Sequence, residues 1–166
     1  ECTKYLLKDV QAFERMLDEG GFEDGQMKIG ADQEICLIDE HYKPSPTAMS
    51  VLETLNNDNF TTELARFNIE ANLQPKDFKG NCFSALEREV DDLLNQLEKV
   101  TSQMEINYLI TGILPTLRKF DMELDNLTPL PRYRALVDAV GKLRGKVYEL
   151  RIKGIDELNL KHDSAM

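Results

Sequence analysis

Acidic side chains recur in two short segments of the chain. Asp32 and Glu34 are separated by one residue in the first segment, and residues 63–72 carry Glu63 and Glu70 in the second. Side chains alternate across a β-strand, so residues two apart project from the same face. Two strands that bring several carboxylates to one surface make an oxygen-rich site for a divalent cation with a phosphorylated ligand.

The second segment divides its side chains between two faces. The apolar face carries Phe67, Ile69, Ala71 and Leu73. The opposite, polar face carries Arg66, Asn68, Glu70, Asn72 and Gln74. The same pattern also fits acids that face bulk water or pair with Arg66 and nearby lysines. Spacing alone favours this simpler interpretation, because polar strand faces are common and the pattern has no diagnostic motif.

Several other chemistries lack their motifs in this chain. No Gly-x-x-x-x-Gly-Lys or Gly-x-Gly-x-x-Gly phosphate loop occurs, and no Gly-x-Ser-x-Gly nucleophile elbow. The two histidines, His41 and His162, are far apart in the sequence, and we expect them in a loop and exposed near the end of the chain. A hydrolase with paired carboxylates stays open, although the chain has no Trp for a sugar cleft.

Composition indicates a soluble globular protein. The 166 residues are 42% hydrophobic and 30% charged, which suits one domain with its own core. A net charge of -10 argues against binding to nucleic acid or to an acidic membrane. No apolar run is long enough to span a bilayer. Free thiols are expected at Cys2, Cys36 and Cys82, with Cys36 packed as a small apolar side chain, so a cytoplasmic location is predicted.

The elements that would position these acids follow from periodicity and turn residues. Strands are expected over residues 27–39, 63–74, 108–114 and 147–153. Helices are expected over residues 5–17, 45–55, 84–100 and 132–140. The connections between strands are long enough for helices. The sequence therefore predicts an α+β domain with a mostly antiparallel sheet and flanking helices.

Particular residues set the expected ends of the helices. Gly20-Gly21 ends the first helix, and Ser45-Pro46 opens the second, with Met49, Leu52 and Leu55 directed inward. Ser84 and Glu87 have the spacing of a capping box at the start of the third helix. Gly141 is expected to end the fourth.

The acidic segments resemble a known family. Ile29-Gly30-Ala31-Asp32-Gln33-Glu34-Ile35 resembles the Gly-x-Glu-x-Glu-Phe strand of the glutamate–cysteine ligase type 2 family, also called carboxylate–amine ligases. Glu63 and Glu70, followed by Pro75, resemble the second acidic strand of that family. Residues 111–116, 131–133, 149–158 and 161–166 fit further family segments in the same order.

The resemblance implies a fold related to glutamine synthetase, in which a curved antiparallel sheet forms a funnel around metal ions. It implies an ATP-dependent ligase of glutathione biosynthesis that needs Mg²⁺. The γ-carboxylate of glutamate would be phosphorylated, and the amine of cysteine would displace phosphate from the acyl phosphate. The expected partners are ATP, glutamate, and cysteine or another amine, and assembly into a homo-oligomer is left open.

The resemblance also implies roles for individual residues. Four carboxylates would hold Mg²⁺ at the nucleotide phosphates: Asp32, Glu34, Glu63 and Glu70. Asn68 would order a metal-bound water beside them, and Arg132 would bind a substrate carboxylate or phosphate. The family commonly has Glu at the position of Asp32, so this shorter side chain reaches less far and leaves open whether it binds the metal directly or through water.

Family members are longer than this chain. Residues 1–166 are therefore expected to be a single domain, the amino-terminal fragment of a longer ligase catalytic domain, and inactive alone. The alternative is a noncatalytic domain whose acidic face binds a basic partner or a metal. The ligase interpretation requires Asp32, Glu34 and Glu70 to converge around one point on a concave sheet, whereas a basic partner requires only a flat acidic surface.

Overall fold

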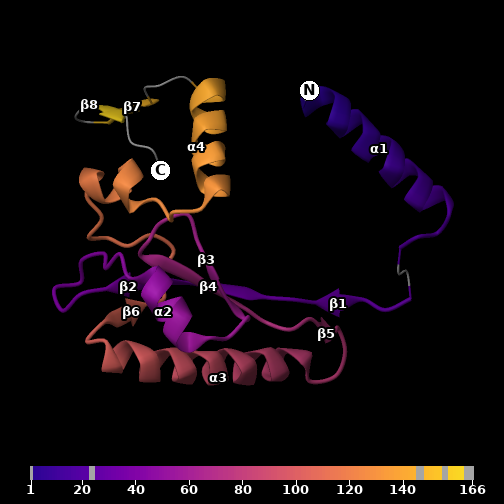
Figure 1. Ribbon diagram of the computed structural model, residues 1–166, viewed down its shortest axis with the longest axis horizontal. Coiled ribbons are helices and arrows are strands. Elements are labelled where there is room, and N and C mark those ends of the chain that lie inside the picture. Colours follow the sequence, from indigo (N-terminus) through magenta and orange to yellow (C-terminus); the bar gives the residue numbers. More distant parts are fainter. Residues whose placement is uncertain (1, 23–24, 145–147, 155–156, 163–166) are drawn as a thin grey trace.

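The computed structural model describes residues 2–22, 25–144, 148–154 and 157–162 (Figure 1). The α-helices are α1 (Cys2–Asp18), α2 (Ala48–Leu55), α3 (Cys82–Gln103) and α4 (Pro131–Arg144). The strands are β1 (Lys28–Ile29), β2 (Asp32–Ile38), β3 (Phe60–Thr62), β4 (Asn68–Asn72), β5 (Lys76–Asp77), β6 (Asn107–Leu109), β7 (Tyr148–Lys153) and β8 (Glu157–His162). Short 3₁₀ helices, η1 (Lys119–Met122) and η2 (Leu124–Asn126), lie between β6 and α4.

A four-stranded sheet forms the centre of the fold, in the order β3-β4-β2-β6. All of its neighbouring strands are antiparallel. Two smaller antiparallel pairs, β1 with β5 and β7 with β8, lie outside it. The arrangement confirms the predicted α+β class with antiparallel sheets and flanking helices.

The core lies between one face of this sheet and the helices α2 and α3, which contact each other (Figure 1). The sheet residues Ile35, Leu37 and Ile69 are fully buried in this core, and Leu97 of α3 is buried with them. The apolar stripe predicted for α3 is confirmed, because its remaining members lie in or against the same core: Leu86, Val90, Leu93, Leu94 and Val100.

The second helix follows its prediction in part, because Leu52 and Leu55 pack against the core as expected. Ala48 and Val51 are its fully buried residues, whereas Met49 is 40% exposed, so the inward direction predicted for Met49 was wrong. The helix begins at Ala48 rather than at Ser45-Pro46, and the side chain of its capping residue, Thr47, makes no capping hydrogen bond. Asn56 ends the helix in the left-handed region, with φ of 43°.

Both acidic strands are interrupted. Residues Gly30-Ala31 separate β1 from β2, and β1 pairs with β5. The segment expected as one strand over residues 63–74 turns at its beginning, where the backbone N–H of Asn68 donates to the carbonyl of Ala65 at 3.0 Å. Because of this turn, the second acidic strand is only β4, and β3 supplies its neighbour.

Three further boundaries differ from expectation, and one strand was not predicted. The helix α3 begins at Cys82, and Asn81 caps it without a side-chain hydrogen bond, so the capping box at Ser84 was wrong. Strand β6 ends at Leu109, and α4 continues through Gly141 to Arg144. Strand β7 matches the expected fourth strand from Tyr148 onward, and Val147 lies outside the described residues. The strand β8 was not predicted.

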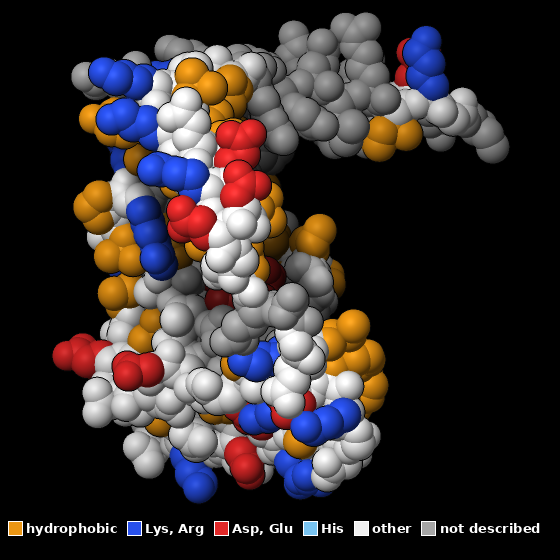
Figure 2. Space-filling model, turned by 90° about the vertical axis from the view of Figure 1, so that its right-hand side faces the viewer, with side chains coloured by type: hydrophobic (Ala, Val, Ile, Leu, Met, Phe, Trp, Pro, Cys, Tyr) orange, Lys and Arg blue, Asp and Glu red, His pale blue; other side chains and the backbone are white. Residues whose placement is uncertain are grey.

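The helix α1 matches its prediction and stands apart from the central sheet (Figure 1). Its apolar side chains are largely uncovered: Tyr5 is 62% exposed, Phe13 54% and Leu17 56%. Figure 2 presents the right-hand side of Figure 1, where α1 lies, and shows hydrophobic side chains uncovered beside lysine and arginine. Among the described residues, no helix has both the length and the apolar character needed to cross a membrane.

Candidate functional site

Strands β2 and β4 form one polar face from directly opposed residues. The register pairs Asp32 with Asn72, Glu34 with Glu70, and Cys36 with Asn68. We call the side chains of Asp32, Glu34, Asn68, Glu70 and Asn72 the acidic face. The structure therefore brings Asp32, Glu34 and Glu70 to one side of the sheet, which is one part of what the ligase interpretation requires.

The opposed carboxylates of Glu34 and Glu70 are the most informative pair of this face. Directly opposed side chains on antiparallel strands lie close together, and like charges at such positions destabilise the sheet. Glu34 is exposed and Glu70 is half-buried. A cation bound between such carboxylates would relieve their repulsion.

Glu70 is held in place by its neighbours on the sheet. Its Oε2 accepts hydrogen bonds from the hydroxyl of Thr61 at 3.2 Å and from Nδ2 of Asn72 at 3.2 Å. The same Nδ2 lies 3.0 Å from the hydroxyl oxygen of Thr61. Thr61 was not among the predicted site residues, because β3 begins before the expected second strand. Its signal was the β-branched pair Thr61-Thr62 directly before Glu63.

Asn68 has an unsatisfied acceptor on the acidic face. Its Oδ1 is buried and has no hydrogen-bond partner among the described residues. A buried acceptor without a donor is costly, so a bound donor group, such as water, would stabilise this position. The prediction that Asn68 orders a metal-bound water is compatible with this geometry and stays a prediction.

Glu63 lies outside the paired strands. It follows β3, and its Oε2 accepts from the backbone N–H of Leu64 at 3.1 Å. Its carbonyl oxygen accepts from the hydroxyl of Thr128 at 2.6 Å. These contacts fix the segment beside β3. The strand register does not bring Glu63 to the acidic face, and its role as a metal ligand stays a prediction.

Arg132 lies in the first turn of α4 and contacts the end of β3. Its Nη2 lies 3.0 Å from the hydroxyl oxygen of Thr62 and 2.9 Å from the hydroxyl oxygen of Tyr133. The guanidinium also stacks over the ring of Tyr133, 4.7 Å from the ring centre. The structure thus places Arg132 beside the strand that supports Glu70.

The acidic face ends in a small apolar cluster. Cys36, which follows Glu34 on the same side of β2, is 3% exposed and packs with Ile38 and Leu114. Burial, and then the charge of Glu34, raise the pKa of the Cys36 thiol. This confirms that Cys36 packs as a small apolar residue. Cys82 is also a buried free thiol, and the side chain of Cys2 is outside the described ones.

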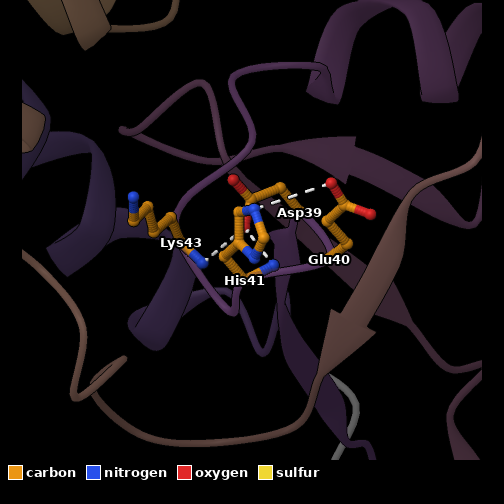
Figure 3. Close-up of polar contacts among 4 residues, drawn as sticks. All are labelled: Asp39, Glu40, His41 and Lys43. Atoms are coloured by element: carbon orange, nitrogen blue, oxygen red, sulfur yellow. Dashed lines mark hydrogen bonds and ion pairs between the residues drawn. The ribbon is translucent and has the colours of Figure 1, made fainter.

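The loop after β2 contains a separate group of polar contacts among Asp39, Glu40, His41 and Lys43 (Figure 3). Oδ1 of Asp39 accepts from the backbone N–H groups of His41 and Lys43, both at 2.8 Å, which lowers the pKa of Asp39. His41 is an exposed loop residue, as expected, with Nε2 at 3.6 Å from Oε1 of Glu40. It comes after Ile38, the end of β2 that is farther from Asp32. The side chain of His162 is outside the described ones.

The donor chemistry of the acidic face fits Mg²⁺, which prefers carboxylate, amide and water oxygens. However, the part of the chain that the structure describes contains no group of three His, Cys, Asp or Glu side chains arranged to hold a metal ion. The side chains of Asp32, Glu34 and Glu70 therefore share a face without gathering around one point, unlike the convergence expected for a ligase. Binding a cation here requires side-chain movement.

Comparison of the chain with known proteins gave no match. No protein-family model matches it, and neither a curated protein nor a solved structure shows significant similarity.

Proposed function

We propose that this chain forms the metal-binding part of an ATP- and Mg²⁺-dependent carboxylate–amine ligase. The opposed carboxylates of Glu34 and Glu70 on an accessible face of an antiparallel sheet carry the proposal. The order of the family-like segments from Ile29 onward supports it from the sequence. The proposal includes a glutamine-synthetase-like fold and a cytoplasmic enzyme of glutathione biosynthesis.

The proposed reaction joins the γ-carboxylate of glutamate to the amine of cysteine, or of another acceptor, through an acyl phosphate. Mg²⁺ supplies charge neutralisation at the nucleotide phosphates when it is bound. Glu34 and Glu70 would provide ligands from adjacent strands, with Asp32 reaching the site directly or through water. Asn68 would accept from a bound water, and Glu63 would add a ligand from beside β3.

Mg²⁺ titration of the chain, followed by calorimetry, tests the metal assignment. Replacing Glu70 by Gln removes one charge and preserves the side-chain length, so we expect Mg²⁺ binding to weaken at least about tenfold. The matched control is Glu87→Gln, an exposed position on α3 outside the acidic face. Equal affinity of wild-type and Glu70→Gln proteins would show that Glu70 does not bind the metal.

Turnover is a separate measurement. In the complete enzyme, ADP release should require glutamate, an amine and Mg²⁺ together, and Glu34→Gln should abolish it. Residues 1–166 alone are expected to bind Mg²⁺ without releasing ADP. Unchanged turnover of Glu34→Gln would exclude Glu34 from the metal site.

A noncatalytic acidic binding domain is the second candidate. The net charge of -10, and the absence of a compact metal-binding group among the described residues, favour it. This candidate predicts binding to a polylysine peptide that weakens with salt and does not depend on Mg²⁺. Loss of that binding in Glu70→Gln, with no Mg²⁺ binding in wild type, would support this candidate over the ligase.

A further inference from the structure

The guanidinium of Arg132 is held by three contacts although it lies at an exposed position. The hydroxyl oxygens of Thr62 and Tyr133 accept from Nη2 at 3.0 and 2.9 Å, and the ring of Tyr133 packs 4.7 Å from the guanidinium carbon. A long arginine side chain at an exposed position usually samples many rotamers. These contacts restrict it to one arrangement.

The hydroxyl groups around Arg132 satisfy one another. The hydroxyl of Tyr133 donates to the carbonyl oxygen of Thr62 at 2.6 Å, so its oxygen remains an acceptor for Nη2 of Arg132. The Thr62 hydroxyl lies 3.1 Å from the same oxygen and can donate to it. Each hydroxyl proton then has an acceptor, and both oxygens accept from the guanidinium.

The remaining donors of Arg132 are available. A guanidinium carries five N–H groups, and the contacts to Thr62 and Tyr133 use only Nη2. Within the described part of the chain, Nε and Nη1 have no hydrogen-bond partner, and Arg132 is exposed. Nε and Nη1 can therefore donate to an oxyanion without breaking the contacts that hold the side chain.

The position of this charge also favours an anion. The first turn of α4 contains Arg132 and Arg134 and no acidic residue. Cations at a helix N-terminus are destabilised by the helix dipole, whereas anions there are stabilised. A bound oxyanion would offset both the dipole and the paired positive charges.

Strand β3 lies between Arg132 and the acidic face, because Thr61 and Thr62 are adjacent residues whose side chains project from opposite faces of the strand. The hydroxyl of Thr61 donates to Glu70, and the next residue, Thr62, accepts from Arg132. We propose that Thr62 and Tyr133 are positioning residues that hold Arg132 to bind an oxyanion, a phosphate or carboxylate group of the substrate. The identity of the oxyanion as a substrate group rests on the proposed function. The inference adds Thr62 and Tyr133 as the residues that position Arg132.

The test measures binding of inorganic phosphate, and of acetate in a second arm, to the chain. The Nε resonance of Arg132 in nitrogen-15 NMR reports binding at this side chain. Tyr133→Phe keeps the ring and removes the hydroxyl, so we expect about fivefold weaker binding of the preferred anion. Tyr42→Phe, at an exposed loop position, is the control and should leave affinity unchanged.

Variants of Thr62 separate positioning from simple structural support. Thr62→Ser retains the hydroxyl and should preserve affinity, whereas Thr62→Val should weaken it about fivefold. The thermal midpoint of each variant is measured in parallel. Weaker binding at an unchanged midpoint supports positioning. Equal affinity in wild type, Tyr133→Phe and Thr62→Val would overturn it, as would an Arg132 Nε resonance that neither anion shifts.

The two arms identify the group that Arg132 takes. Tighter binding of phosphate would assign the position to the transferred phosphate, and tighter binding of acetate to a substrate carboxylate. Mg²⁺ titration of Tyr133→Phe should match that of wild type. Phosphate binding at Arg132 without any Mg²⁺ binding would refute the proposed function and keep the anion position. Mg²⁺ binding without a response at Arg132 would refute the anion position and leave the proposed function standing.

Discussion

At the level of single residues, Glu34 and Glu70 share a feature that a purely structural sheet would avoid. The two carboxylates are directly opposed, and the Thr61 and Asn72 side chains donate to Glu70 rather than a basic residue pairing with it. Those hydrogen bonds fix the carboxylate, and no basic side chain among the described residues forms an ion pair with it. Such an arrangement suits the binding of a cation better than it suits stability.

Thr61→Val tests this orienting role. Valine has nearly the shape of threonine and favours a strand, so the sheet should keep its stability within about 1 kcal/mol. Without the hydroxyl, Glu70 loses a donor that orients it, and Mg²⁺ affinity should fall about tenfold by calorimetry. Thr54→Val, on the exposed side of α2, is the control. Unchanged Mg²⁺ affinity in Thr61→Val would contradict the orienting role.

At the level of elements, Glu89 joins α3 to the segment that follows β4. Its Oε1 accepts from the backbone N–H of Gln74 at 2.8 Å, and its Oε2 lies 2.7 Å from Nζ of Lys76. The hydrogen bond from Gln74, and then Lys76, hold the pKa of Glu89 below its usual value. The Glu89 side chain is 17% exposed, so solvent screens the pair only partly.

Glu89→Gln should destabilise the fold at neutral pH by about 1 kcal/mol. The lowered pKa means that Glu89 contributes stability above its unfolded pKa, near 4.3, and loses the contribution as pH falls through its folded value. Urea unfolding at pH 7 and at pH 3 should therefore show a difference between variant and wild type at pH 7 that shrinks at pH 3. The exposed Glu87→Gln is the control, and a difference that grows at acid pH would contradict the assignment.

The sequence predicted helices better than strand lengths, for reasons that particular residues show. The apolar stripe of α3 repeats over many turns, so its buried face was evident, and α1 matched as well. The segment before Asn68 alternates like a strand but turns, because Ala65 pairs with Leu127 far along the chain. Gly141 lies inside α4 because glycine lowers helix stability without forbidding a helix.

The acidic face was predictable because it follows from strand alternation. Asp32, Glu34 and Glu70 needed only the strand period and an antiparallel pairing to share a side. Tyr133 was not predictable, since it acts through a contact between elements distant in sequence, whereas Thr61 contacts Glu70 from the preceding strand. The hydrogen bond from Tyr133 to Thr62 exists only once α4 reaches the end of β3.

At the scale of the whole molecule, packing is uneven. The central sheet buries one face against α2 and α3, and its acidic face stays partly open (Figure 1). The helix α1 has an apolar stripe, yet its large side chains remain about half exposed. The stability of the domain should therefore depend on the sheet, α2 and α3, and only slightly on α1.

Removing residues 1–21 tests this division. Since Tyr5, Phe13 and Leu17 are 62%, 54% and 56% exposed, their loss should change the free energy of unfolding by less than about 1 kcal/mol. Leu97→Ala, by contrast, removes a side chain with 0% exposure and should cost about 2–5 kcal/mol. The chain has no Trp, so far-ultraviolet circular dichroism in urea is the suitable measurement. If the truncation were as costly as Leu97→Ala, α1 would have to bury its apolar stripe against the domain in solution, because no other source of that stability lies in residues 1–21.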